Sequence, residues 1–305
     1  MTTPLGGRRR YAGMRSVLEV PILKPRYWAK VPEVDADAIM LDLEDSATPS
    51  MKDHVRGRVV EALADRSYFG DRHVVVRTNN LATPWGRADL EALSEVDADV
   101  LVCYPKVRDA AELAEAREIL SSRGTAHGLY VMIETAAAVL DLERIAAERN
   151  VVGLHFGYVD YAADVGSRPF AESGDDLFAP ANHYVRAKIA VAAAANDLFA
   201  TGGTLIPEYR DLAKVAAFVR SWAALGYSGC VVVSPAHLPV VNETFRPSAE
   251  EVARAETTCR AYEAAVDRGD PAAVVDGTVV TLPDYRVASL VLARSVDRDH
   301  RMENR

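Results

Sequence analysis

Short apolar runs alternate with amphipathic stretches along the chain. Eight runs are rich in Val, Ile and Leu without strict alternation, which is typical of strands covered on both faces. They span residues 17–20, 38–43, 74–77, 100–104, 129–133, 153–157, 199–204 and 230–233. Helix-like segments lie between them at 88–93, 110–120, 137–148, 184–195 and 209–224. Eight strand–helix units in about 250 residues predict a (β/α)8 TIM barrel; a doubly wound open sheet is the alternative.

Glycine and proline mark the irregular parts of this pattern. The seventh run is the weakest strand, because it contains Gly202 and Gly203. The longest connection, 161–184, contains several breakers, including Gly166 and Pro169. We therefore expect it to be a loop over one end of the barrel.

A different pattern follows Pro247. Ser248 is placed as the cap of a helix over 252–265, and Asp276–Gly277 is a hairpin signal within 274–281. A last helix is expected at 284–295, followed by a charged, frayed tail at 297–305. The sequence thus predicts a TIM-barrel catalytic domain over 1–247 and a short helix–hairpin–helix extension over 248–305.

Composition narrows the class of protein. The chain has 305 residues, 49% hydrophobic and 26% charged, which is enough for a large core. Its net charge of −9 argues against nucleic acid or an anionic membrane as a partner. Arg8–Arg10 precede no apolar stretch, so no signal peptide is expected. Three scattered cysteines predict neither a disulfide framework nor a cysteine metal site, and indicate a cytoplasmic protein.

Polar side chains gather where the predicted strands end. The second strand ends in Asp42, Glu44 and Asp45, and the third in residues 77–80; Pro105–Lys106, Glu134–Thr135 and residues 158–160 follow the next three. In a parallel barrel all these positions lie on the carboxyl rim, where barrel enzymes keep their chemistry. The sequence therefore predicts an active site at this rim.

Two carboxylates on neighbouring strands suggest a metal. Glu134 and Asp160 end the fifth and sixth strands, and a pair of carboxylates with water suits Mg2+. A helix N-cap at Asp160 and a buried ion pair between Glu134 and Arg77 are equally compatible with the spacing. The acidic cluster of Asp42, Glu44 and Asp45 is either a solvated loop start or a set of groups that hold metal-bound water.

The basic residues of this rim each have two interpretations. Arg77 suits a substrate carboxylate or a structural pair with the acids. Lys106 is a Schiff-base nucleophile or, as nearby acids favour, a charge-balancing ammonium. Lys24 and Arg26, after the first strand, bind phosphate or lie in a solvated loop. His155, inside the sixth strand, is expected to be a core histidine.

Several short stretches together resemble the HpcH/HpaI aldolase family, in its citrate lyase beta-subunit-like branch with malyl-CoA and citramalyl-CoA lyases. The similar stretches occur in the family's order across about residues 15–265, at 15–18, 41–46, 76–79, 83–86, 105–107, 133–135, 156–157 with 160–164, and 239–243. The resemblance implies a TIM barrel in trimers or hexamers. It also implies Mg2+ on Glu134 and Asp160, with Arg77 on the substrate and Lys24 and Arg26 near the nucleotide of CoA.

The family chemistry that this resemblance implies is Mg2+-dependent cleavage or formation of a carbon–carbon bond through an enolate. The substrate would be a small β-hydroxy acid or its CoA thioester, with Glu44 and Asp45 holding metal waters and Lys106 also catalytic. Five positions depart from the family pattern. Near the end of the first strand, Glu19 replaces an aromatic residue and Ile22 a glycine, and the stretch 201–206 lacks the usual aspartate. Ser234 replaces a histidine and Thr281 an aspartate. A thioesterase, an enzyme for a non-CoA substrate and a non-catalytic binding subunit are therefore the alternatives.

Overall fold

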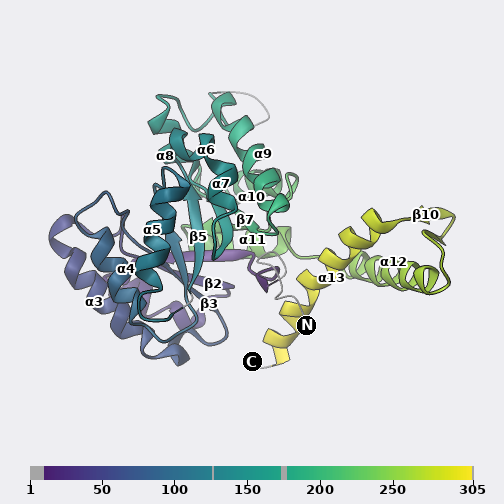
Figure 1. Ribbon diagram of the computed structural model, residues 1–305, viewed down its shortest axis with the longest axis horizontal. Coiled ribbons are helices and arrows are strands. Elements are labelled where there is room, and N and C mark those ends of the chain that lie inside the picture. Colours follow the sequence, from purple (N-terminus) through teal and green to yellow (C-terminus); the bar gives the residue numbers. More distant parts are fainter. Residues whose placement is uncertain (1–9, 126, 173–176, 304–305) are drawn as a thin grey trace.

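The computed structural model describes residues 10–125, 127–172 and 177–303, with side chains described as far as residue 295. Eight parallel strands close into a barrel in sequence order, so the TIM barrel is confirmed and the open sheet is wrong. Figure 1 shows strands of this barrel enclosed by helices. The strands are β1 (Ser16–Val20), β2 (Ala38–Asp42), β3 (His73–Arg77), β4 (Leu101–Tyr104), β5 (Gly128–Ile133), β6 (Val151–Phe156), β7 (Phe199–Gly203) and β8 (Gly229–Val232).

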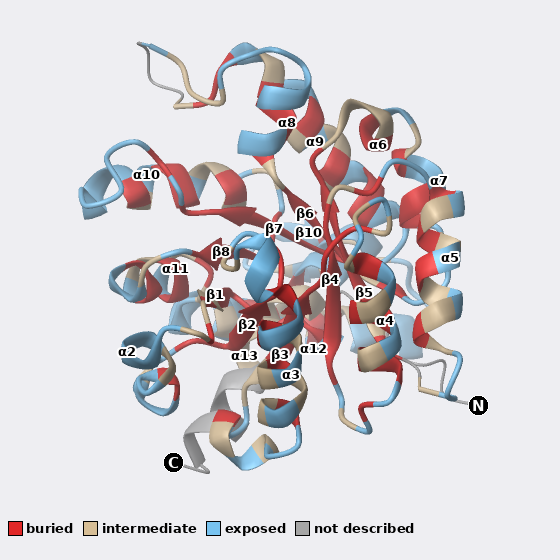
Figure 2. Ribbon diagram, turned by 90° about the vertical axis from the view of Figure 1, so that its left-hand side faces the viewer, coloured by how far each residue is buried: buried red, intermediate tan, exposed pale blue. Residues whose placement is uncertain are grey.

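Apolar side chains fill the barrel on both sides of the sheet. Val17, Met40, Val75 and Tyr130 belong to a buried cluster that is separate from the larger cluster containing Leu18, in keeping with alternation along each strand. Figure 2 shows the central strands buried, while the surrounding helices alternate buried and exposed faces. Because both faces of the strands are covered, their runs are continuously apolar.

Helices surround the barrel, and side-chain caps mark the first turn of some of them. Asp109 accepts from the Glu112 N–H at the start of α5, and Asp211 accepts from the Ala213 and Lys214 N–H groups at the start of α10. The barrel helices are α2 (Pro25–Trp28), α3 (Lys52–Leu63), α4 (Gly86–Ser94), α5 (Ala110–Leu120), α6 (Ala136–Leu140), α7 (Leu142–Ala146), α8 (Tyr158–Asp164), α9 (Pro180–Ala195), α10 (Leu212–Ala223) and α11 (Leu238–Thr244).

The glycine-rich seventh strand is accounted for by its neighbour on α10. A Cβ at Gly202 would lie 2.2 Å from the indole ring of Trp222, so this position must lack a side chain. The Trp222 indole N–H donates to the Gly203 carbonyl at 3.1 Å. Gly202 thus admits Trp222 against the sheet, while a Cβ at Gly203 would meet the Tyr158 ring at 3.0 Å.

Two of the expected elements differ in extent. The connection 161–184 is not all loop, because α8 continues to Asp164 and α9 begins at Pro180, where the ring fixes φ for a first turn. Gly174 and residues 175–176 of this connection lie outside the described residues. The single helix expected at 137–148 is divided at Asp141 into α6 and α7.

The extension projects to one side of the barrel as an arm (Figure 1). Helix α12 (Ala249–Asp267) begins with a capping box between Ser248 and Glu251, and packs against α13 (Leu282–Glu303) and β9 (Ala273–Val275). The expected hairpin joins β9 to β10 (Thr278–Val280), with positive φ at Asp276 and Gly277. Helix α13 is longer than expected, and the division into domains at residue 247 stays a prediction. Within the described residues, no helix is long and apolar enough to cross a membrane.

Candidate active site

Lys106 lies at the centre of the charged groups on the carboxyl rim. Its Nζ is 2.5 Å from Glu44 Oε1, after β2, and 3.8 Å from Asp160 Oδ1, in the first turn of α8. Its backbone N–H donates to Glu134 Oε1 at 2.7 Å. Lys106 adopts the left-handed backbone conformation, with φ of 50°. The structure therefore brings together Glu44, Lys106, Glu134 and Asp160 from four different strand ends.

Glu134 is the most deeply buried of these acids, with 3% of its surface exposed. Burial, together with the nearby charges of Glu44 and Asp160, raises its pKa to about 8. The side chain fits here because residue 157 is glycine: a Cβ at Gly157 would lie 2.2 Å from Glu134 Oε2. Crowded carboxylates of this kind are stabilised as anions when a cation lies between them.

Arg77, at the end of β3, is held by acids other than Glu134. Its Nε and Nη2 donate to the two oxygens of Asp42 at 2.7 and 2.8 Å, and Nη2 also donates to Glu19 at 3.3 Å. Glu44 lies 3.5 Å from Nε. An ion pair between Glu134 and Arg77 is therefore wrong, because Asp42 occupies the guanidinium fork.

Asp42 is a structural anchor of the site. It is fully buried and also accepts the Glu44 and Ser46 N–H groups at 2.9 and 2.8 Å. Burial acts to raise its pKa, but the Arg77 guanidinium and these N–H groups outweigh it, so the pKa is lowered. The second-strand acids therefore differ: Asp42 orients Arg77, Glu44 faces Lys106, and Asp45 is mostly exposed, 3.9 Å from Arg77 Nη1.

Lys52 of α3 supports this region and was missed in the sequence. Its buried ammonium donates to the carbonyls of Leu43 and Glu44 at 2.8 and 2.5 Å, and to Asn79 Oδ1 at 2.8 Å. Burial lowers its pKa. The signal was present, because Lys52 shares helical spacing with the buried Val55 and Val59.

The contacts of Lys106 decide between its two interpretations. Burial acts to lower its pKa, but the hydrogen bond and charge of Glu44 and the charge of Glu134 raise it. A Schiff-base lysine needs the opposite, a pKa lowered toward neutrality. The geometry favours the charge-balancing ammonium.

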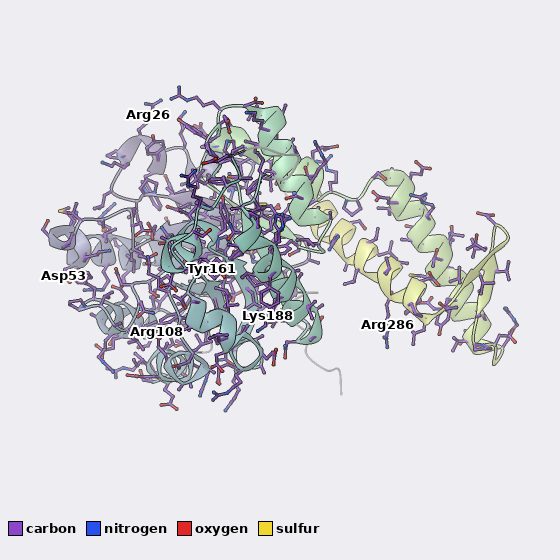
Figure 3. All side chains as sticks on the ribbon, turned by 90° about the horizontal axis from the view of Figure 1, so that it is seen from above. Arg26, Asp53, Arg108, Tyr161, Lys188 and Arg286 are labelled. Atoms are coloured by element: carbon purple, nitrogen blue, oxygen red, sulfur yellow. The ribbon has the colours of Figure 1, made fainter. Side chains whose placement is uncertain are left out.

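Other predicted residues lie apart from this cluster. Lys24 and Arg26 are exposed at α2, and no hydrogen bond or ion pair in the described residues joins them to the acids; Figure 3 shows Arg26 at the edge of the barrel. Thr281 caps α13 in the extension, where its hydroxyl and N–H donate to Asp284. His155 is a core residue, as expected, with Nδ1 at 3.0 Å from Thr201 Oγ1.

The Mg2+ ion that the family resemblance implies would need its ligands from the side chains of the mouth. In the part of the chain that the structure describes, no three His, Cys, Asp or Glu side chains are arranged around one metal position. Two carboxylates with several waters are nevertheless a usual Mg2+ site. Glu134 and Asp160 fit this chemistry, since Gly157 leaves room for the Glu134 carboxylate, and burial with the charges of Glu44 and Asp160 raises its pKa, an effect that a bound cation would oppose.

Comparisons with known proteins find sequences that are similar along most of the chain. The family model described as HpcH/HpaI aldolase/citrate lyase matches residues 15–235. A (3S)-malyl-CoA thioesterase of Cereibacter sphaeroides is 34% identical over 92% of this chain and 94% of its own length. An L-malyl-CoA/beta-methylmalyl-CoA lyase of the same species is 28% identical over 90% of this chain and 92% of its own length.

Solved structures give the same assignment. CitE from Mycobacterium tuberculosis, in complex with magnesium, acetoacetate and coenzyme A, has a TM-score of 0.72 and 27% identity, covering 93% of this chain and 99% of that one. A citrate lyase from Burkholderia xenovorans has a TM-score of 0.77 at 20% identity, covering 94% of this chain and 92% of that one, and that similarity concerns the fold alone.

Proposed function

Because the chain belongs to the HpcH/HpaI aldolase/citrate lyase family, we propose that it is a Mg2+-dependent carbon–carbon lyase that cleaves or forms a β-hydroxyacyl-CoA thioester. The expected enzyme class, a carbon–carbon lyase, is confirmed at the level of the family and its named relatives. The substrate, the metal and the roles of individual residues are the content of the proposal.

One observation carries this function: Glu44, Arg77, Lys106, Glu134 and Asp160 converge on one mouth of the barrel. Cleavage of a β-hydroxyacyl compound leaves negative charge on an enolate oxygen, and enzymes stabilise such charge with preorganised cations. The mouth combines a carboxylate pair that suits a divalent ion with the fixed guanidinium of Arg77. It can therefore place two positive charges near the enolate oxygen.

Each residue of the mouth would have its own role in this reaction. Glu134 and Asp160 would hold Mg2+, which when bound supplies the positive charge that stabilises a developing enolate oxygen. Asp42 occupies Nε and Nη2 of Arg77, which leaves Nη1 for a carboxyl or carbonyl oxygen of the substrate. Lys106 neutralises Glu44, and Glu44 and Asp45 would hold water in the mouth.

The proposal is tested by product analysis with purified enzyme and MgCl2. Incubation with (3S)-malyl-CoA, citramalyl-CoA and the corresponding free acids should give acetyl-CoA together with glyoxylate or pyruvate from at least one thioester. A preference for a free acid would move the assignment to a non-CoA substrate. No cleavage of any of these compounds would overturn the proposed lyase.

A thioesterase is the second candidate, because the relative at 34% identity carries that name. The same product analysis separates the two activities. A lyase releases acetyl-CoA and an oxo acid, whereas a thioesterase releases malate and free CoA. Family membership favours either enzyme over a non-catalytic binding subunit, which would show neither pair of products.

A further inference from the structure

The proposed cleavage needs a group that takes the proton from the β-hydroxyl. Among the described acids of the mouth, most are committed to other partners. Asp42 is saturated by Arg77 and backbone N–H groups, and Glu44 is bound to the Lys106 ammonium. Glu134 and Asp160 are the proposed metal positions. Asp45 is 63% exposed and lies 3.9 Å from Arg77 Nη1, beyond hydrogen-bond distance. Glu19 is then the partly buried carboxylate beside Arg77 that remains among the described residues.

Glu19 meets the geometric requirements. It is the fourth residue of β1, and its Oε1 accepts one hydrogen bond from Arg77 Nη2 at 3.3 Å, which directs the carboxyl group into the mouth. Among the described residues, Arg77 is the hydrogen-bond partner of this carboxyl group, so a lone pair remains for a substrate proton. About a quarter of the side chain is exposed (26%), which leaves it reachable from the mouth.

The electrostatic surroundings of Glu19 suit proton transfer. Burial raises its pKa, the Arg77 charge opposes that effect, and the charges of Asp42, Asp45 and Glu44 add to it. A carboxyl group with a raised pKa takes up and returns a proton more readily near neutral pH than an ordinary glutamate. The Arg77 charge limits this rise in pKa, so Glu19 can still act as a carboxylate.

The barrel places Glu19 opposite the proposed metal position. In the closed order of strands, β1 is four strands away from β5 in either direction, so Glu19 and Glu134 stand on opposite walls. A substrate whose carbonyl oxygen lies toward Glu134 and Asp160 therefore presents another face to Glu19. This separation keeps the base from being consumed as a metal ligand.

Resting on the lyase activity proposed above, we infer that Glu19 is the catalytic acid–base residue of the reaction. Its carboxylate takes the β-hydroxyl proton, and the O–H electron pair forms the carbonyl of the oxo product. The Cα–Cβ bond breaks, and its electron pair forms the enolate of the thioester. The protonated Glu19 then gives the proton to the α-carbon, which yields the acyl-CoA and restores the carboxylate.

Hydrogen–deuterium exchange into acetyl-CoA tests this step apart from carbon–carbon cleavage. Wild-type enzyme, Glu19→Gln, Glu19→Asp and the surface control Glu33→Gln are incubated with acetyl-CoA and MgCl2 in D2O, and methyl-group exchange is followed by mass spectrometry. Propionyl-CoA is run in parallel. We expect Glu19→Gln to reduce exchange by about 100-fold or more. Glu19→Asp should retain part of the exchange, and Glu33→Gln should match the wild type.

Mg2+ binding and folding are measured on the same variants. Unchanged Mg2+ affinity and melting temperature in Glu19→Gln support a role in proton transfer, whereas lost Mg2+ binding would overturn it. If Glu19→Gln exchanges deuterium as fast as the wild type does, Glu19 is not the acid–base residue. That result would not contradict the proposed lyase activity. If the wild type exchanges neither acyl-CoA and cleaves none of the thioesters, the proposed function itself fails.

Discussion

Glu134 shows how single residues set the chemistry of this site. Its carboxylate is buried beside Glu44 and Asp160, yet it accepts a hydrogen bond from the Lys106 backbone. The sequence placed it at the end of a strand, but it could not show that Arg77 is occupied by Asp42. Pairing choices among several acids depend on side-chain geometry within the closed barrel, which spacing along the chain does not specify.

Gly157→Ala tests the space beside Glu134. The added methyl would meet Glu134 Oε2 at 2.2 Å, so it should displace the carboxylate and lower both Mg2+ affinity and turnover by at least about 10-fold. The measurement is a Mg2+ titration alongside an activity assay. Gly57→Ala on α3 is the matched control, since its added methyl meets nothing within 4 Å.

The control has its own expected result. Gly57→Ala should leave Mg2+ affinity unchanged and should raise stability by about 0.5–1 kcal/mol, because alanine is the better helix former. Wild-type Mg2+ affinity in Gly157→Ala would show that the space beside Glu134 has no part in metal binding.

At the scale of elements, the apolar runs were sufficient to predict all eight strands, because strands covered on both faces are continuously apolar in sequence. Helices were less well predicted. The break at Asp141 and the first turn of α9 at Pro180 depend on local capping and ring geometry rather than on periodicity. The glycines of β7 suggested a weak strand, but Trp222 packs where a Gly202 side chain would lie and Tyr158 packs beside Gly203.

The stability of the protein should depend on pH through His155, which lies on β6 beside Thr201 of β7. Burial, with the Arg77 charge, lowers the His155 pKa from 6.5 to about 3. In the unfolded chain this histidine takes up a proton below pH 6.5, whereas in the folded protein it does not until about pH 3. Stability is therefore lost as pH falls through this window, by about 2 kcal/mol at pH 5.

Denaturant unfolding of the wild type and His155→Gln at pH 7.5 and pH 5 measures this contribution. The wild type should lose about 2 kcal/mol more than the variant between the two pH values. Equal losses in both proteins would show that His155 is already protonated, or solvated, in the folded state.

At the scale of the whole molecule, the extension buries little apolar surface of its own. Its buried clusters contain only a few residues each among those described, such as Ala255, Cys259 and Ala288. Val274 and Val279 face each other across the hairpin and are 69% and 61% exposed. The homo-oligomer that the sequence implies, a trimer or hexamer, stays a prediction, and this hairpin is a candidate for its interface.

Light scattering of the wild type and of Val274→Asp/Val279→Asp tests that prediction. The wild type should have the mass of an oligomer, and the double variant should dissociate while keeping its circular dichroism spectrum, since both side chains are exposed in the monomer. A monomeric wild type would contradict the expected assembly. An oligomeric double variant would move the interface away from the hairpin.

Binding of Mg2+ at the barrel mouth is the central claim, and isothermal titration of metal-free protein with MgCl2 tests it most directly. The account predicts saturable binding of one Mg2+ per chain to the wild type. It also predicts that Glu134→Gln and Asp160→Asn each weaken this binding by at least about 10-fold while the barrel stays folded. Binding of equal strength in the wild type and both variants, or no binding by the wild type, would contradict it.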